Sequence, residues 1–511
     1  MTKSIFAYII ILLMCNVVTA QCPIGQIDIQ SQVDVDSFAF KYPNCNTVDD
    51  IFIFGDGIID LTPLSVIDSV MGQIVFYGLD SLQSLQGIGQ LDYVGEFIGV
   101  QANENLVSID NLLSIDNFSG EVLIKDNPSI KHIEWSGEAD TMSYITIENN
   151  HALERIVGGS SVSHIYGSIL IVNCDALLEV TGFESIESIS KELVIATSSK
   201  LESVDAFRNI REIGTTFTLS GNASLSQFGA LDSLQKVGDF SILNNNFETL
   251  PSFDALDTVV NQFYILDDIL RSIDGFSDFR YCSHFVITSN SLEVLSGFES
   301  FDSTQRFSIF CRNLETIDAF ENLRSAKSFS ISRIHSLLNL DNFRNLKRVG
   351  DLRLQGSSLD DNVLTDISGL SGLDADYLEE IVIIYVDNLS MCGIAPICTF
   401  LEDSLSDHGF GNNSTGCNSR DEILASCDAL SSSAEVLDFE MSPNPVEDYL
   451  QIRSDRLIDE YVISSIDGAT VIRRKANAFA IDIPTEDLTS GMYVVQLRSD
   501  GIVSSRKFVK K

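Results

Sequence analysis

The sequence is poor in several residue types that specialised functions require. Its 511 residues include 32 Lys and Arg against 73 Asp and Glu, with only 6 His, 9 Pro and 1 Trp, and the formal net charge is −41. This shortage of basic side chains argues against nucleic-acid binding, because phosphate contacts need clustered Lys and Arg. The few histidines leave little material for a His-rich metal centre. With 44% hydrophobic residues, however, the chain is too apolar to be disordered throughout.

Long hydrophobic runs are also missing. No stretch approaches the roughly 18 uninterrupted apolar residues of a membrane span, so we expect no transmembrane segment in the mature chain. Residues 1–20 carry Lys3, the short apolar run Ile5–Met14 and small residues at their end, which predicts a secretory signal peptide. A lipoprotein signal ending at Cys15 is the alternative, but Met14 is larger than the small residue that usually precedes a lipidated cysteine.

The linear motifs of catalysis are absent as well. The six histidines are scattered and none belongs to an HExxH pair, and Gly369–Leu373 misses the GxSxG pattern. Residues 34–36 begin like a calcium loop but lack its glycine and its final Glu. We therefore predict that the protein is not an enzyme and has no cofactor and no metal site. A hydrolase without a linear motif remains an alternative.

What the sequence has in plenty is self-similarity. About fifteen units, each of roughly 22–24 residues, run through residues 51–401. Each unit begins with an apolar-x-apolar pattern, which predicts a short strand with alternating faces. A single unit cannot bury its inward face alone, so the units must stack into one long parallel sheet. The sequence therefore predicts a mainly β protein built around a solenoid.

The sixth position of the unit is usually a small polar residue. Such a side chain can point inward and satisfy backbone groups at the turn, which predicts a ladder through the stack. The expected rungs are Asn103, Asn127, Asn150, Cys174, Ser198, Asn222, Asn245, Asp268 and Asn290. At this position Cys174 is interpreted as a buried structural thiol.

This region resembles the leucine-rich-repeat family, and more closely the receptor L-domain-like solenoids of cell surfaces. The resemblance implies a right-handed parallel β-solenoid with disulfide-closed caps at residues 21–50 and 402–430. It also implies a disulfide between Cys22 and Cys45. Four later cysteines should pair among themselves in one of three ways, and we favour Cys392 with Cys417 and Cys398 with Cys427. The cysteines at 282 and 311 occupy different repeat positions and are left unpaired.

The second and fourth positions of each strand point away from the core. Exposed aromatic rings on a rigid sheet suit a sugar or peptide ligand, although aromatic and β-branched residues also simply favour strands. The candidate binding residues are Phe52, Phe54, Tyr77, Tyr264, Leu266 and Phe310, and the first three are the preferred location. Val75, Leu170 and Val172 occupy equivalent positions.

The composition changes near the C-terminus. Residues 431–435 look like a serine-rich linker, and residues 436–511 hold 12 acids and 10 bases, a net charge of −2. Subtracting these and Lys3 from the totals leaves 61 acids and 21 bases in residues 21–435, a net charge of −40. Turn signals such as Asp467-Gly468 predict about seven short strands in a small antiparallel β-sandwich.

Residues 436–511 resemble the C-terminal sorting domain of the type IX (Por) secretion system of Bacteroidetes. The resemblance rests on four blocks in order, and its signal residues are Pro443, Asn444, Pro445, Gly468, Gly491, Tyr493, Lys507, Lys510 and Lys511. It implies the type IX machinery of the outer membrane as a partner. It also implies a final location at the cell surface or in the medium, usually with removal of the sorting domain.

Together these observations predict a secreted or cell-surface recognition and adhesion protein. Its rigid repeat surface would bind an unidentified protein or polysaccharide. The alternatives are a self-associating structural component of the cell surface and the hydrolase mentioned above.

Overall fold

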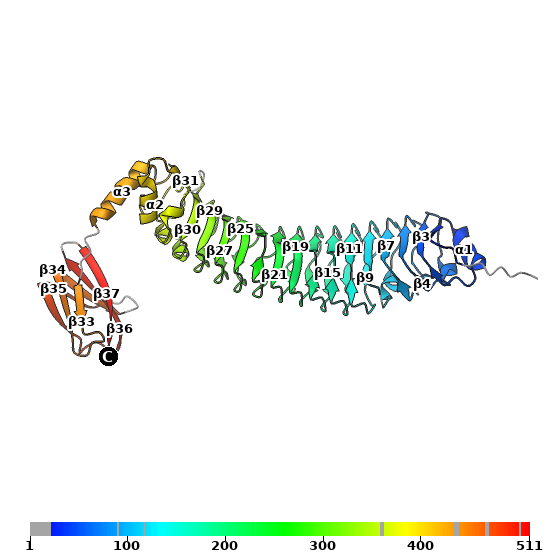
Figure 1. Ribbon diagram of the computed structural model, residues 1–511, viewed down its shortest axis with the longest axis horizontal. Coiled ribbons are helices and arrows are strands. Elements are labelled where there is room, and N and C mark those ends of the chain that lie inside the picture. Colours follow the sequence, from blue (N-terminus) through cyan, green and yellow to red (C-terminus); the bar gives the residue numbers. More distant parts are fainter. Residues whose placement is uncertain are drawn as a thin grey trace, which may run out of the picture. The chain divides into compact units, whose positions relative to one another are not determined.

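The computed structural model describes residues 22–88, 91–116, 118–229, 231–357, 362–433, 439–465, 470–499 and 502–511. The predicted signal peptide and Gly468 lie outside these ranges. The chain divides into two compact units, residues 1–419 and 420–511. The first is a parallel β-solenoid and the second contains an antiparallel sheet, so the mainly β fold class is confirmed (Figure 1). Among the described helices, none is long and apolar enough to cross a membrane.

The solenoid is built on one long parallel sheet, which has 21 strands within the described residues. Its strands are β1 (Gln26–Ile29), β3 (Asp50–Phe54), β5 (Gln73–Tyr77), β7 (Phe97–Gln101), β8 (Glu121–Lys125), β10 (Thr141–Met142), β11 (Tyr144–Glu148), β13 (His164–Ile165), β14 (Ile169–Val172), β16 (Ser188–Ile189), β17 (Glu192–Ala196), β19 (Glu212–Ser220), β21 (Lys236–Leu243), β22 (Thr258–Val259), β23 (Gln262–Leu266), β25 (Tyr281–Ser289), β27 (Ser303–Cys311), β29 (Ser325–Ser332), β30 (Arg348–Gln355), β31 (Glu380–Ile384) and β32 (Asp407–Gly411).

Three smaller parallel sheets form other sides of the solenoid. They contain β2 (Thr47–Val48), β4 (Ser69–Val70) and β6 (Tyr93–Val94); β9 (His132–Glu134), β12 (Arg155–Val157), β15 (Glu179–Gly182), β18 (Ser203–Ala206) and β20 (Gln227–Phe228); and β24 (Ser272–Ile273), β26 (Val294–Ser296) and β28 (Thr316–Asp318). Short 3-10 turns occur at η1 (Thr62–Leu64), η2 (Asp110–Ser114), η3 (Asp341–Phe343), η4 (Ser368–Leu370) and η5 (Ala375–Tyr377).

Columns of identical or similar side chains fill the core. One column stacks Phe240, Phe263, Phe285, Phe307 and Phe329, with ring centroids 5.0–5.2 Å apart and planes within 5° of parallel. These rings are fully buried. Because each repeat contacts its neighbours through such columns, the strands cannot slide without disrupting the whole stack, and the main sheet is a rigid surface.

The polar ladder is present. The amide oxygen of Asn127 accepts bonds from the backbone N–H (3.1 Å) and the side-chain amide (2.9 Å) of Asn103, and the Asn127 N–H donates in turn to Asn150 Oδ1 (3.1 Å). The expected rungs from Asn103 to Asn245 are all buried. The last two expectations were wrong by one residue, because successive units there are only 22 residues apart. The rungs are Asp267 and Ser289, whereas Asp268 and Asn290 are exposed.

Asp267 places a carboxylate in this buried ladder. It is 1% exposed and accepts bonds from the N–H groups of Asn245 and Ile269, both at 3.0 Å. Removal from water raises its pKa, although these backbone bonds oppose the rise. The cysteine thiols at 174, 282 and 311 are free and buried, and burial raises the pKa of Cys174 to about 12. This supports the structural interpretation of Cys174.

The parallel stack extends beyond both ends of the predicted repeat region. At the N-terminus β1 pairs in parallel with β3, so the predicted cap supplies the first strand, and α1 (Gln32–Lys41) follows it. Ser31 caps α1 by accepting a hydrogen bond from the Asp34 N–H (3.3 Å). At the other end β32 pairs with β31 and the cap helix α2 (Ala395–Glu402) begins before residue 402.

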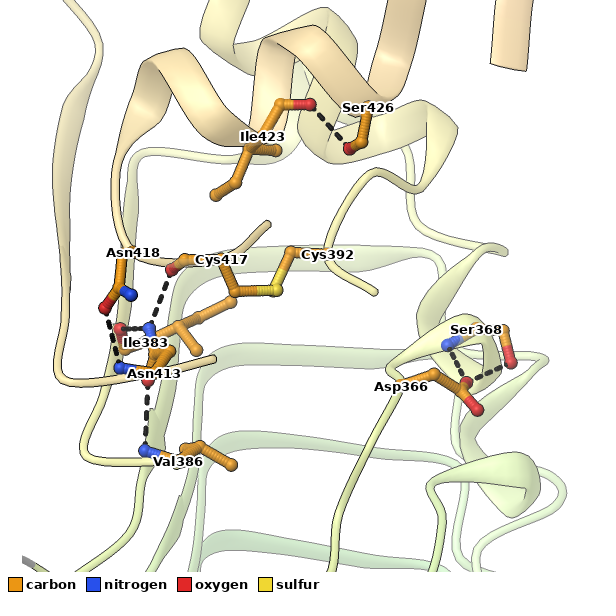
Figure 2. Close-up of a disulfide and its surroundings, with 10 residues drawn as sticks. All are labelled: Asp366, Ser368, Ile383, Val386, Cys392, Asn413, Cys417, Asn418, Ile423 and Ser426. Carbon is orange, nitrogen blue, oxygen red and sulfur yellow. Dashed lines mark hydrogen bonds between the residues drawn. A yellow bond between two sulfur atoms is a disulfide. The ribbon is translucent and has the colours of Figure 1, made fainter. Parts of the chain in front are cut away.

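Disulfides fasten both ends of the stack. The structure contains Cys22–Cys45 and Cys392–Cys417, the pairs favoured from the sequence. Cys398 and Cys427 are also disulfide-bonded, and their mutual pairing stays a prediction. Next to Cys392–Cys417, Asn413 forms a terminal rung of the ladder: it accepts from the Val386 N–H (3.0 Å) and donates to the carbonyl oxygens of Ile383 and Cys417, both at 2.8 Å (Figure 2).

The second unit begins with α3 (Arg420–Ser433), which contains three of the serines predicted as linker. Its sheet has five described strands: β33 (Phe439–Ser442), β34 (Tyr449–Ser465), β35 (Thr470–Pro484), β36 (Gly491–Ser499) and β37 (Ile502–Lys510). All pair antiparallel, as predicted, but the described strands form one sheet rather than the expected sandwich, and they are fewer and longer than the seven expected. Register shifts interrupt the β34–β35 pairing, so one long strand reads in the sequence as two short ones.

Candidate functional site

The outward face belongs to the main sheet, which has more described strands than any other sheet of the solenoid. We define it as the main-sheet side chains that alternate with the buried ones. In-register parallel pairing aligns them in rows across the strands, for example Phe52, Val75, Gly99 and Leu123 in the middle row. A second row runs through Phe54, Tyr77, Gln101 and Lys125. The face therefore presents side chains at regular spacing on a rigid support.

The structure brings the three preferred candidates together near the N-terminal end of this face. Phe52 and Phe54 lie on β3 and Tyr77 lies opposite Phe54 on β5. Tyr77 is 55% exposed and the two phenylalanines are partly exposed, whereas Val75, opposite Phe52 on β5, is only 8% exposed. Four residues form what we call the N-terminal aromatic patch: Phe52, Phe54, Tyr77 and Phe97, the last of which lies on β7.

Phe97 was missed in the sequence because it precedes the apolar-x-apolar pattern rather than belonging to it. Its ring lies over Gly99: a Cβ atom at residue 99 would be 2.6 Å from Phe97 Cε1 and 3.1 Å from Cζ. Any larger residue at position 99 would therefore displace the ring. The alternation of Phe97 with the inward-facing Ile98 was the sequence signal that could have placed it on the outward face.

Polar side chains border the patch. Gln73 and Gln101 are partly exposed, and Asp50 accepts a bond from the Gln73 N–H at 2.8 Å. The neighbouring base, Lys125, forms an ion pair with Glu148 at 3.0 Å, and this bond raises the pKa of Lys125. The border thus offers amides and carboxylates, while its lysine is already engaged.

The other three candidates also lie together, farther along the same face. Tyr264 and Leu266 are on β23 and Phe310 is on β27, and Leu243 and Val286 join them on β21 and β25. All are partly exposed. Nine strand spacings of about 4.8 Å separate β3 from β23, so these two strands are roughly 43 Å apart. Leu170 and Val172 lie between them on β14.

Within the described part of the chain, no group of three or more His, Cys, Asp or Glu side chains is arranged to hold a metal ion. A hollow of about 310 Å³ lies on the five-stranded parallel sheet and is lined by His132, Glu154, Arg155 and Glu179 among others. Arg155 and Glu179 are neutralised there by their own ion pair at 2.6 Å.

Several described sorting-signal residues of the second unit contact neighbouring segments of its sheet. Asn444, which follows Pro443 and precedes Pro445, accepts a bond from the Val509 N–H (2.9 Å) and so holds the first block against β37. Tyr493 is buried on β36, where it stacks on Phe508 with centroids 5.7 Å apart. Lys507 and Lys510 lie on β37, Gly491 begins β36, and Lys511 pairs with Glu447 at 2.9 Å.

Comparison with known proteins gives the clearest result for the second unit. Residues 440–511 match the family model of the secretion system C-terminal sorting domain, so the predicted sorting domain is confirmed. No curated protein matches the chain. Among solved structures, a leucine-rich repeat protein from Bacteroides ovatus ATCC 8483 is 13% identical, with 67% of this chain and 87% of that chain covered. Its TM-score of 0.16 is too low to support an argument. The sorting domain implies export by type IX secretion.

Proposed function

We propose that the protein is an exported, non-enzymatic recognition protein that binds its ligand on the N-terminal aromatic patch. Residues 1–20 act as the signal peptide in this proposal, and the sorting domain directs passage through the outer membrane to the cell surface or medium. The observation that carries the proposal is the 55% exposure of Tyr77, opposite Phe54, on a rigid sheet face that also carries Phe52 and Phe97 on the adjacent strands. Aromatic side chains gathered at the surface of a monomer are typical of binding sites.

An array of glycans and proteins probed with the purified full chain tests this function. We expect discrete hits that are lost with Tyr77→Ala, which removes a mostly exposed ring and should leave folding intact. Tyr264→Ala is the matched control because it removes a tyrosine from the same sheet face, eight strand spacings or roughly 38 Å from Tyr77. Each variant is checked by its unfolding midpoint.

Two results would overturn the proposal. Hits that survive in Tyr77→Ala would place the binding site elsewhere. A blank array together with concentration-dependent oligomers in sedimentation would favour a structural component of the cell surface instead.

A further inference from the structure

The border of the N-terminal aromatic patch limits the chemistry of its ligand. The inference rests on the function proposed above, and it concerns the hydrogen-bonding and charged groups that a ligand on these rings would meet. Gln73 and Asp50 lie on one side and Gln101 on the other, and each presents oxygen or amide nitrogen. Such groups accept bonds from hydroxyl groups and donate bonds to them.

A polyanionic ligand does not fit this border. Lys125, which follows Gln101 in the same row, is paired with Glu148, and Glu121 follows Phe97 in another row. Residues 21–435 carry a net charge of −40, so the field around the solenoid repels anions. An acidic polysaccharide or an anionic lipid surface would therefore gain little and would meet like charge.

The shape of the patch favours an extended ligand. Because Gly99 has no side chain, the ring of Phe97 lies down against its own strand rather than standing away from it. The rings of Phe97, Tyr77 and Phe52 belong to three adjacent strands, whose middle row holds the mostly buried Val75 and the side-chain-free Gly99. A platform of this kind can stack several pyranose rings but cannot surround a single small molecule.

From these observations we infer that the ligand of the N-terminal aromatic patch is a neutral polysaccharide lying across β3, β5 and β7. The apolar faces of its sugar rings stack on the aromatic side chains. Its hydroxyl groups bond to Gln73, Gln101 and Asp50. The inference names the ligand class and leaves the sugar to be identified by experiment.

Affinity electrophoresis and calorimetry with the full chain test the ligand class. The probes are uncharged glucans and mannans on one side, and alginate and polygalacturonate on the other. We expect binding to a neutral polymer only, with less than about a twofold change in Kd between low and high ionic strength. Tyr77→Ala should weaken binding about tenfold, whereas Tyr77→Phe keeps the ring and should stay within about twofold.

A glycine pair supplies a second test that does not remove a ring. Gly99→Val would push the Phe97 ring off the sheet and weaken binding. Gly409→Val is the matched control: it lies on β32 of the same sheet, where an added Cβ would meet nothing closer than 3.7 Å. The binding of the two variants is compared only if their unfolding midpoints are equal, so that a loss of binding does not reflect unfolding.

The possible outcomes separate the ligand class from the site. Preferred, salt-sensitive binding of an acidic polymer would overturn the ligand class, and so would binding to proteins alone. If that binding were lost in Tyr77→Ala, the proposed function would still stand. Neutral-polymer binding that survives in both Tyr77→Ala and Gly99→Val would overturn the site. An absence of any binding, including on the array, would overturn the proposed function itself.

Discussion

At the scale of single residues, the polar ladder matters most to stability. Asn127 is completely buried and both ends of its side-chain amide are used. Its oxygen serves Asn103, and its nitrogen donates to the carbonyl oxygens of Val100 (2.9 Å) and Lys125 (3.0 Å). A residue that satisfies backbone groups of neighbouring repeats links those repeats in a way that apolar packing alone does not.

We predict that Asn127→Ala lowers the free energy of unfolding by about 3 kcal/mol, because it leaves buried donors and acceptors without partners. Urea unfolding measures this loss. Asn127→Ser is the comparison, since Ser198 already serves as a rung and accepts from the Cys174 N–H at 3.3 Å. The serine variant should lose less, and equal losses in the two variants would contradict a hydrogen-bonding role for this rung.

Individual positions could be predicted from the sequence only where the repeat keeps its length. The rungs from Asn103 to Asn245 were correctly assigned because the spacing of 23 to 24 residues is regular there. After Asn245 the spacing falls to 22 residues, which moves the inward position from 268 to 267. A linear pattern does not show which residue of a turn was lost. Phe97 was missed for a different reason, since it precedes the apolar-x-apolar pattern of its unit rather than belonging to it.

At the scale of elements, the ends of the solenoid differ from its middle. An inner strand has two neighbours, whereas β1 and β32 each pair with one described strand. Repeat proteins unfold from such ends because terminal repeats lack half of their interfaces. The disulfides Cys22–Cys45 and Cys392–Cys417 lie at these weak points, and they close segments with sequence separations of 23 and 25 residues.

We predict that the double variant Cys392→Ser/Cys417→Ser destabilises the C-terminal end by about 3 kcal/mol, because it frees the unfolded chain from loop closure. Hydrogen exchange should become faster in β31 and β32 and stay unchanged in β11. The double variant Cys22→Ser/Cys45→Ser is the mirror control and should affect β1 and β3 only. Uniform acceleration along the solenoid in either variant would contradict the nearest-neighbour picture.

The sequence predicted which elements form better than it predicted where they begin and end. Stacked apolar-x-apolar strands follow from the repeat, but β1 and β32 have sequences unlike the other units and were assigned to caps. Gly409 and Gly411 give β32 little strand propensity, so its pairing with β31 depends on the neighbouring repeat. Likewise the serines at 431–433 extend α3 because nothing in that stretch, such as Gly or Pro, ends a helix.

At the scale of the whole molecule, function is divided between two units of different charge. The acidic solenoid carries the candidate binding surface, and the second unit carries the sorting domain within residues 436–511, whose net charge is only −2. The four sorting blocks are separated in the sequence, yet Asn444 and Tyr493 connect the first and third blocks to β37. We therefore predict that the export machinery recognises a folded surface, which a single substitution can disturb without touching the solenoid.

We predict that Asn444→Ala reduces the exported fraction several-fold in a bacterium with type IX machinery, because the Val509 N–H loses its partner at 2.9 Å and the first block is no longer held against β37. Immunoblots of periplasm and medium measure the fraction. Glu447→Gln is the control: it breaks only the exposed ion pair to Lys511, which contributes little to stability, and export should be normal. Normal export of Asn444→Ala would show that the machinery reads the blocks as linear sequence, whereas failure of Glu447→Gln would show that it reads the charge at the terminal block.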